Sequence, residues 1–189
     1  MIIVDGHLDL AINALQWNRD LLRSVYTIRS LEEGMPEPGR AQGTVALPEL
    51  RQGRVALCFA TLLARATGRP VPHLDYLSTA QAYGAARGQL AYYRALEQQG
   101  HVRIICERAA LDDHIARWEA WDASATDQQT PPPPTLPVGI VVAMEGADPI
   151  LSPDQLAEWW EAGLRVLGPT HYGPGRYAGG TGVEEGLSE

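Results

Sequence analysis

Residue types that bind divalent metals stand directly after an apolar run at the start of this chain. His7 and Asp9 follow the strand-like residues 2–4. Alternate side chains of an extended chain share a face, so His7 and Asp9 are predicted to point the same way, as are Asp5 and His7. An imidazole nitrogen and a carboxylate oxygen aimed into one pocket are both good zinc ligands. A His-x-Asp pair also arises by chance, and a plain turn in which Asp5 caps backbone amides is the alternative.

A carboxylate later in the chain strengthens the metal hypothesis. Glu145 follows the apolar residues 139–144 (GIVVAM) and precedes Gly146. A carboxylate at the tip of a buried strand is costly unless it is paired or bound to a metal. The alternative is a structural ion pair with an arginine. Because its two oxygens can bind two cations, Glu145 also suits a binuclear centre.

Of the four other histidines, one is a candidate site residue and three are not. His171 follows the run 164–170 (LRVLGPT) in a glycine-rich loop, where local hydrogen bonds are the competing explanation. His73 follows a proline-rich turn, His101 follows Gly100, and His114 lies within a helix-like stretch beside acidic residues. These three are predicted to be surface groups.

Apolar runs of strand length alternate with longer helix-like stretches. Strands are predicted at residues 2–4, 54–63, 102–106, 139–144 and 164–170, and helices at about 75–99, 111–121 and 152–163. Continuously apolar strands separated by helices are typical of a parallel sheet covered on both faces. No glycine-rich phosphate turn follows the first strand, which removes the main support for a dinucleotide-binding fold. In an α/β barrel the active site is built where the strands end, which is where all the candidate residues are placed.

Composition narrows the class of protein. The net charge of -8 and the absence of a basic stripe argue against nucleic-acid binding. All 15 basic residues are arginine, so a lysine nucleophile, Schiff base or carbamylated-lysine metal bridge is excluded within this chain. Cys58 and Cys106 lie in apolar runs and are predicted to be buried thiols, which suits a reducing compartment. Neither a signal peptide nor a membrane span is evident, so a cytoplasmic protein is expected. The proline-rich residues 122–137 are predicted to form a solvated loop.

Three segments in order along the chain resemble one family. VDGHLDL (residues 4–10), VVAMEGADPI (141–150) and GLRVLGPTHYGPGRYAGGTG (163–182) are similar to the membrane (renal) dipeptidase family of metallopeptidases, in particular its bacterial cytoplasmic relatives. The spacing from the glutamate to the later histidine also agrees. The resemblance implies a zinc-dependent dipeptidase on a (β/α)₈ TIM barrel of the metal-dependent hydrolase type.

The resemblance also implies roles for the residues named above. His7 and Asp9 would bind one Zn²⁺, Glu145 would bridge two, and His171 would contact the dipeptide substrate and polarise its scissile carbonyl. Hydrolysis would proceed through a metal-bridging hydroxide. The lack of lysine fits, because this family uses a glutamate bridge where related hydrolases use a carbamylated lysine.

There are departures from the family pattern. Leu8 stands where many members have asparagine. The histidines for the second zinc, the arginine for the substrate carboxylate and a late catalytic aspartate are expected beyond Glu189. Residues 1–189 are therefore predicted to be the N-terminal portion, roughly half, of a single barrel domain that is inactive by itself. A non-catalytic fragment with at most one weak metal site, and an α/β scaffold protein, are the alternatives. The exposed edges of an incomplete barrel would favour homo-oligomers.

Overall fold

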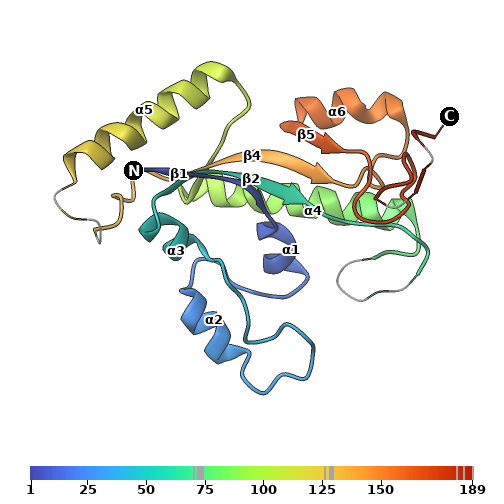
Figure 1. Ribbon diagram of the computed structural model, residues 1–189, viewed down its shortest axis with the longest axis horizontal. Coiled ribbons are helices and arrows are strands. Elements are labelled where there is room, and N and C mark those ends of the chain that lie inside the picture. Colours follow the sequence, from blue (N-terminus) through green and yellow to red (C-terminus); the bar gives the residue numbers. More distant parts are fainter. Residues whose placement is uncertain are drawn as a thin grey trace.

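The computed structural model describes residues 1–69, 71, 75–125, 127, 130–181, 183–184 and 186–188. They form a parallel sheet with helices around it (Figure 1). The strands are β1 (Ile3–Leu8), β2 (Val55–Leu62), β3 (Val102–Ile104), β4 (Val138–Glu145) and β5 (Leu164–Gly168). The helices are α1 (Leu10–Leu15), α2 (Val25–Leu31), α3 (Leu47–Gln52), α4 (Thr79–Gln98), α5 (Arg108–Ser124) and α6 (Leu156–Glu161), the last preceded by the 3-10 turn η1 (Pro153–Gln155).

Every pair of strands in the sheet is parallel, as predicted. The order is β1-β2-β4-β3, and β5 also pairs with β4. β3 pairs with the start of β4, where Val102 lies opposite Val138, and β5 pairs with its end, where Gly168 lies opposite Glu145. Since β2 pairs along most of β4, β3 and β5 share the other side of that strand. The described strands make an open five-stranded sheet, and the eight-stranded barrel stays a prediction.

The two central strands are buried on both faces. All residues of β2 except Phe59 are buried, and so are all residues of β4 except Val141 and Glu145. A strand covered on both sides must be apolar at successive positions, which is why these segments show no alternation in the sequence. β1, at the edge of the sheet, begins with the exposed side chains of Ile3 and Val4.

The long helix α4 runs along the sheet (Figure 1) and begins and ends at recognisable signals. The side chain of Ser78 accepts a hydrogen bond from the backbone N–H of Gln81, and Gly100 follows the helix with a φ of +79°. Its buried residues recur at spacings of three and four, so one stripe faces the core: Ala82, Ala86, Gln89, Leu90, Tyr93 and Leu96. The predicted helix at 75–99 is confirmed, with a later start.

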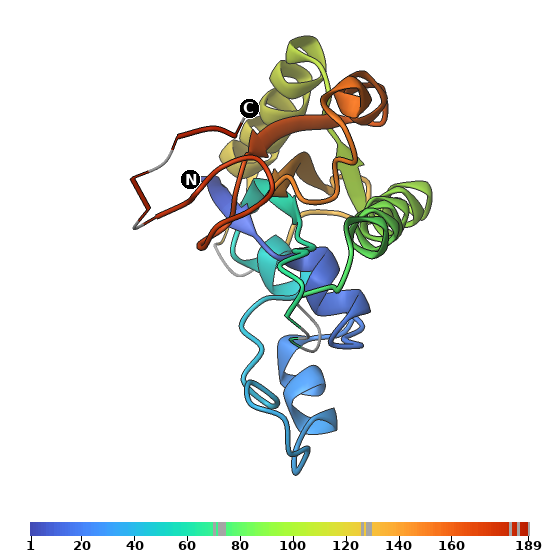
Figure 2. The same ribbon diagram turned by 90° about the vertical axis from the view of Figure 1, so that its right-hand side faces the viewer.

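Residues 10–52 contain three helices that no pattern in the sequence predicts. α1, α2 and α3 are each six or seven residues long, too short to show clear helical periodicity. They are stabilised by burial of side chains such as Leu21, Val25 and Leu50 in the main core. In Figure 2, α2 and the loop after it extend away from the sheet.

α5 lies over the edge where the strands begin, opposite the edge where the candidate site residues lie. The Trp118 Nε1 donates a hydrogen bond to the carbonyl of Pro137, directly before β4, at 3.0 Å. The helix is longer than the predicted 111–121 and extends into the segment predicted to be a proline-rich loop. The prolines themselves lie outside helices and strands, as predicted.

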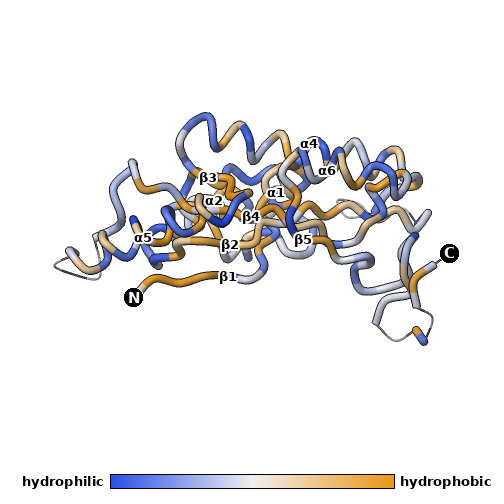
Figure 3. The backbone as a smooth tube through the Cα atoms, turned by 90° about the horizontal axis from the view of Figure 1, so that it is seen from above, coloured by the Kyte–Doolittle hydropathy of each residue, from blue (hydrophilic) through white to orange (hydrophobic). Residues whose placement is uncertain are grey.

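The apolar residues gather along the strands, whereas the helices alternate between hydrophobic and hydrophilic stretches (Figure 3). Trp118 and Trp159 are fully buried and pack in the interior, whereas 54% of Trp160 is exposed. Both cysteines are free; Cys58 is buried and Cys106 is only half-buried. No helix in the described part of the chain is long and apolar enough to cross a membrane.

Candidate metal centre

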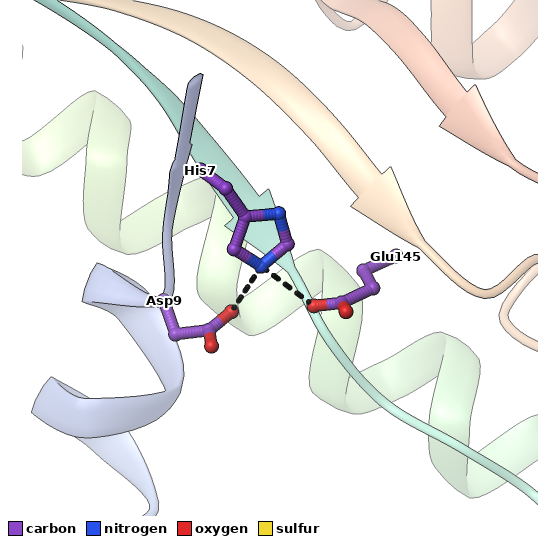
Figure 4. A group of neighbouring side chains, drawn as sticks. All are labelled: His7, Asp9 and Glu145. Carbon is purple, nitrogen blue, oxygen red and sulfur yellow. Dashed lines mark ion pairs between the residues drawn. The ribbon is translucent and has the colours of Figure 1, made fainter. Parts of the chain in front are cut away.

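The candidate ligands come from two strands that end at the same edge of the sheet. His7 lies near the end of β1, Asp9 is the residue between β1 and α1, and Glu145 is the last residue of β4. Because all strands run parallel, their carboxyl ends meet at one edge although Asp9 and Glu145 are far apart in sequence. The side chains of all three residues point toward one another in Figure 4.

The three side chains lie close enough to share a cation. The His7 Nε2 is 3.1 Å from the Glu145 Oε2 and 3.6 Å from the Asp9 Oδ1. One ligand atom from each residue lies within 4.8 Å of the other two. The site is open to solvent on the His7 side, since 53% of that side chain is exposed, against 23% for Glu145. The predicted convergence is therefore present, and the metal-ligand roles stay a prediction.

The local turn at His7 keeps the imidazole free for the site. A side-chain oxygen of Asp5 accepts a hydrogen bond from the backbone N–H of His7 at 2.9 Å. Asp5 thus caps the turn, as the alternative proposed, while the ring of His7 faces Glu145. The capping turn of the alternative is therefore present, and the metal-binding role of the His7 ring stays a prediction.

Glu145 fits a metal ligand better than a structural ion pair. No arginine is among the partners of this carboxylate in the described part of the chain. Its Oε2 is buried and accepts no hydrogen bond from the described residues. Its ion-pair neighbour is the His7 Nε2 at 3.1 Å, which meets no hydrogen-bond geometry, and a cation beside such a buried carboxylate oxygen would remove the cost of burying it. One imidazole and two carboxylates are a donor set that suits Zn²⁺.

His171 reaches the same carboxylate from another strand. It lies three residues beyond β5, and its Nε2 is 3.0 Å from the Glu145 Oε1. Gly146 has a φ of +87°, and a Cβ there would approach the backbone nitrogen of His171 to 3.3 Å. The glycine after Glu145 therefore lets the two loops approach each other closely. The two oxygens of Glu145 face two different imidazoles, and His171 stands outside the three-residue group that could share one ion.

The fold around this site is found in solved structures of metallopeptidases. Dipeptidase AC, a metallopeptidase of family M19, matches 100% of this chain at 22% identity with a TM-score of 0.59. A Rhodobacter sphaeroides metallopeptidase liganded with a phosphinate mimic of the dipeptide L-Ala-D-Ala matches 95% at 18% identity and a TM-score of 0.59. The probable dipeptidase PvdM of Pseudomonas aeruginosa matches 95% at 13% identity, also with a TM-score of 0.59.

This chain has the fold of those metallopeptidases. The predicted structural resemblance to the dipeptidase family is thereby confirmed, at the level of the fold. The chain spans 51%, 48% and 37% of the three matched chains, about half their length or less. No protein-family model and no curated protein sequence matches the chain.

Two residues without a local sequence signal, Thr61 and Asn13, contact Asp9, and Tyr93 supports Thr61. The hydroxyl of Thr61, in β2, donates a short hydrogen bond to the Asp9 Oδ1. The side-chain amide of Asn13 donates to the backbone carbonyl of Asp9 at 2.8 Å. The Tyr93 hydroxyl, from α4, donates to the carbonyl of Thr61 at 2.8 Å and accepts from the N–H of Ala11 at 3.0 Å. Tyr93 is fully buried, and burial raises its pKa well above the usual value, so it stays neutral.

A buried cluster of charged side chains lies behind Asn13, on the side away from the candidate site. Asn13 accepts a hydrogen bond from Arg19 at 2.6 Å, and Arg19 binds both oxygens of Glu32 at 2.7 and 3.0 Å. Arg40 and the backbone N–H of Ala41 also donate to Glu32. Hydrogen bonds from Arg19, followed by those from Ala41 and Arg40, outweigh the effect of burial and lower the pKa of Glu32 to about 2. This carboxylate therefore anchors Arg40 and Ala41 in the loop after α2.

The other histidines do not join the site. His114 was predicted to be a surface group, and this prediction is wrong, because the residue is completely buried. Its Nε2 lies 2.8 Å from the carbonyl of Ala56 and burial lowers its pKa, so the ring is held neutral at the far edge of the sheet. A Cβ on Gly139 would come within 2.6 Å of that nitrogen, so the glycine makes room for the ring. His101 is half-buried, and His73 lies outside the described residues.

Proposed function

We propose that this site is the metal centre of a zinc-dependent dipeptidase. The observation that carries the proposal is the convergence of His7, Asp9 and Glu145, with the two oxygens of Glu145 facing two different imidazoles. The fold shared with metallopeptidases supports it, and one of those structures holds a mimic of a dipeptide. Oxygen and nitrogen donors alone do not select a metal, so zinc is proposed from the family resemblance.

Each residue would have its own role in such a centre. His7 and Asp9 would hold one cation, and Glu145, with one oxygen toward His7 and one toward His171, would bridge to a second. A bound divalent cation lowers the pKa of a water molecule and polarises a carbonyl group, which is the chemistry that peptide hydrolysis needs. Thr61 fixes the orientation of the Asp9 carboxylate.

His171 is proposed to contact the substrate and to stand outside the ligand group. Its side chain is 27% exposed and lines a pocket beside the metal centre. If a cation took the place of the imidazole beside the Glu145 Oε1, the His171 Nε2–H would be free to donate a hydrogen bond to the carbonyl oxygen of the scissile peptide bond, where negative charge develops during hydrolysis. A donor placed in this way orients the substrate and stabilises the transition state.

Zinc titration of the purified chain tests these roles. We expect His7→Ala and Glu145→Gln each to weaken zinc binding at least about tenfold, as loss of a ligand does. His171→Ala should change zinc affinity by less than about threefold. His101→Ala is the matched control, because it removes an imidazole far from the site. Equal losses in His7→Ala and His171→Ala would show that His171 is a ligand; unchanged zinc binding in His7→Ala would overturn the metal centre.

A further inference from the structure

A pocket of about 810 Å³ adjoins the metal centre, and His171 lines it. Its other walls come from the loops that follow β2, β4 and β5, at the same edge of the sheet as the candidate ligands. A volume of this size is typical of small-molecule sites. We name it the arginine pocket, defined by Arg65, Arg69, Thr170, His171 and Arg176.

The carboxylates of the arginine pocket are occupied by structural hydrogen bonds. Asp148 is buried, and its two oxygens accept from the backbone N–H groups of Ala66 and Arg176, each at 2.9 Å. Asp148 therefore joins the loop after β2 to the loop after β5. It acts as part of the wall, because neither oxygen is left without a partner.

The second carboxylate is neutralised by an arginine of the same wall. The side chain of Asp75 is 1% exposed and lies 3.2 Å from the Arg65 Nη2. It also accepts hydrogen bonds from the N–H and the hydroxyl of Thr67, at 2.8 and 2.7 Å. Arg65 and Asp75 together contribute no net charge to the pocket.

Two arginines remain with their charge available. Arg69 and Arg176 are both exposed, and the ion pairs of the described residues include neither of them. The guanidinium carbon of Arg176 lies 5.4 Å from the ring centre of Tyr177, a contact that limits its freedom. Asp148 has only backbone partners and keeps its single negative charge, so the two arginines leave the pocket with a net positive charge. In a chain with a net charge of -8, a positive pocket beside a proposed catalytic centre marks a place for an anion.

We propose that the arginine pocket binds the side-chain carboxylate of an acidic dipeptide, through Arg69 and Arg176. This inference rests on the proposed function. If His171 contacts the carbonyl of the scissile bond, the pocket that His171 lines receives one of the two amino-acid residues of the dipeptide. The volume is large enough for a whole side chain of the dipeptide together with its terminal carboxylate or amino group. Two guanidinium groups from different loops suit a carboxylate, which arginine binds through paired hydrogen bonds.

The test compares dipeptides that differ only in the side-chain charge. Calorimetric titration of the metal-free chain with Ala-Asp, Ala-Asn, Asp-Ala and Asn-Ala avoids hydrolysis, and all four ligands carry the same main-chain carboxylate. We expect one aspartyl dipeptide to bind at least about tenfold more tightly than its asparaginyl counterpart, with a difference that shrinks as salt is added. Arg69→Gln and Arg176→Gln should each remove most of this preference.

Arg108→Gln is the matched control, since it makes the same charge change on a side chain that is 93% exposed and distant in sequence from the pocket. Equal affinity for the aspartyl and asparaginyl dipeptides, or an unchanged preference in the double variant of Arg69 and Arg176, would overturn the proposal. If His7→Ala leaves zinc binding unchanged while the aspartyl preference is observed, the proposed function is wrong and the pocket is an anion site. If zinc binds as proposed but aspartyl dipeptides are not preferred, only the proposal for the arginine pocket is wrong.

Discussion

The geometry of Asp9 depends on a neighbour that would not touch the metal. The carboxylate of Asp9 lies between His7, at 3.6 Å, and the hydroxyl of Thr61, which donates to it from β2. Asp9 is also the residue at the start of α1, so its backbone is fixed by the helix while its side chain is fixed by the sheet. Such outer partners orient a ligand before the cation arrives, which lowers the entropy lost on binding.

Replacing Thr61 by valine tests this orientation. Thr61→Val keeps the shape of a buried residue and removes the hydrogen bond to Asp9, so zinc affinity should fall about tenfold. Calorimetric zinc titration measures the change. Thr27→Val, at an exposed position of α2, is the control and should bind zinc as the unaltered chain does. An unaltered affinity in Thr61→Val would show that the hydroxyl plays no part in positioning Asp9.

Glu32 is a second residue whose charge is set by its neighbours. Its pKa of about 2 lies below the ordinary value of 4.5, chiefly because Arg19 donates to it. A carboxyl whose pKa is lower in the folded than in the unfolded chain stabilises the fold at pH above 4.5. That contribution is lost as the pH falls from about 4.5 to about 2.

The pH dependence of stability in Glu32→Gln tests this assignment. We expect the variant to lose about 2–3 kcal/mol of unfolding free energy at neutral pH, because Arg19 and Arg40 lose their buried partner. The difference from the unaltered chain should shrink below pH 4.5 and be small near pH 2. Urea unfolding at a series of pH values measures it. Glu33→Gln, exposed and adjacent, should lose little at any pH; a pH-independent loss in Glu32→Gln would contradict the ionic explanation.

Among the elements, α4 supports the part of the candidate site around Asp9. Tyr93 links the start of α1 to the end of β2, since its hydroxyl contacts both Ala11 and Thr61. One turn earlier, the side-chain amide of Gln89 pairs with both backbone groups of Leu63, at 2.7 and 2.8 Å. These polar groups are buried and satisfied, so they specify how the helix lies against the strands as well as stabilising it.

Removing one hydroxyl from α4 should be measurable in stability. Tyr93→Phe leaves the N–H of Ala11 and the carbonyl of Thr61 without their buried partner, at a cost of about 1–3 kcal/mol of unfolding free energy. Urea unfolding gives the value. The control is Tyr92→Phe, at a half-buried position next along the helix, which should cost less than about 0.5 kcal/mol. Equal effects of the two changes would mean that the Tyr93 hydrogen bonds contribute nothing specific.

At the scale of the whole molecule, the described sheet has apolar side chains at its outer strands. Ile3 and Val4 of β1 are 43% and 54% exposed, and Val166 and Leu167 of β5 are 41% and 38% exposed. Exposed strands of this kind favour association with another chain or segment. The homo-oligomer expected from the sequence therefore stays a prediction, which sedimentation of the chain over a range of concentrations would address.

We also predict that the 189-residue chain binds zinc but does not hydrolyse dipeptides. In the described part of the chain, His7, Asp9 and Glu145 provide the one group that could hold a cation, and Glu145 alone would reach a second. A hydrolytic centre with two cations needs further ligands and walls that exclude water. An assay against L-L and L-D dipeptides with added zinc measures this. Zinc-dependent turnover that disappears in His7→Ala would show that the site is complete as it stands.

The order of the five strands and of α4, α5 and α6, and the candidate ligands, could be read from local features of the sequence. Continuous apolar runs predict buried parallel strands, and the boundaries of β2 and β4 lie within a residue of those expected. His7, Asp9, Glu145 and His171 follow the ends of such runs, and parallel strands bring those ends to one edge. Both inferences depend on properties of neighbouring residues, which the sequence displays directly.

Only the tertiary structure decided which distant residues support the site. Thr61 and Asp9 are 52 residues apart, and Tyr93 and Ala11 are 82 apart, so their hydrogen bonds depend on strand register and helix packing that no local pattern contains. The same reason explains why His114, beside acidic residues in the sequence, is buried: α5 lies over the edge where the strands begin, and Gly139 leaves space for the ring. The arginine pocket likewise exists because three loops meet at one edge of the sheet. Types and spacing of residues therefore determined the proposed chemistry, and contacts between distant segments determined its geometry.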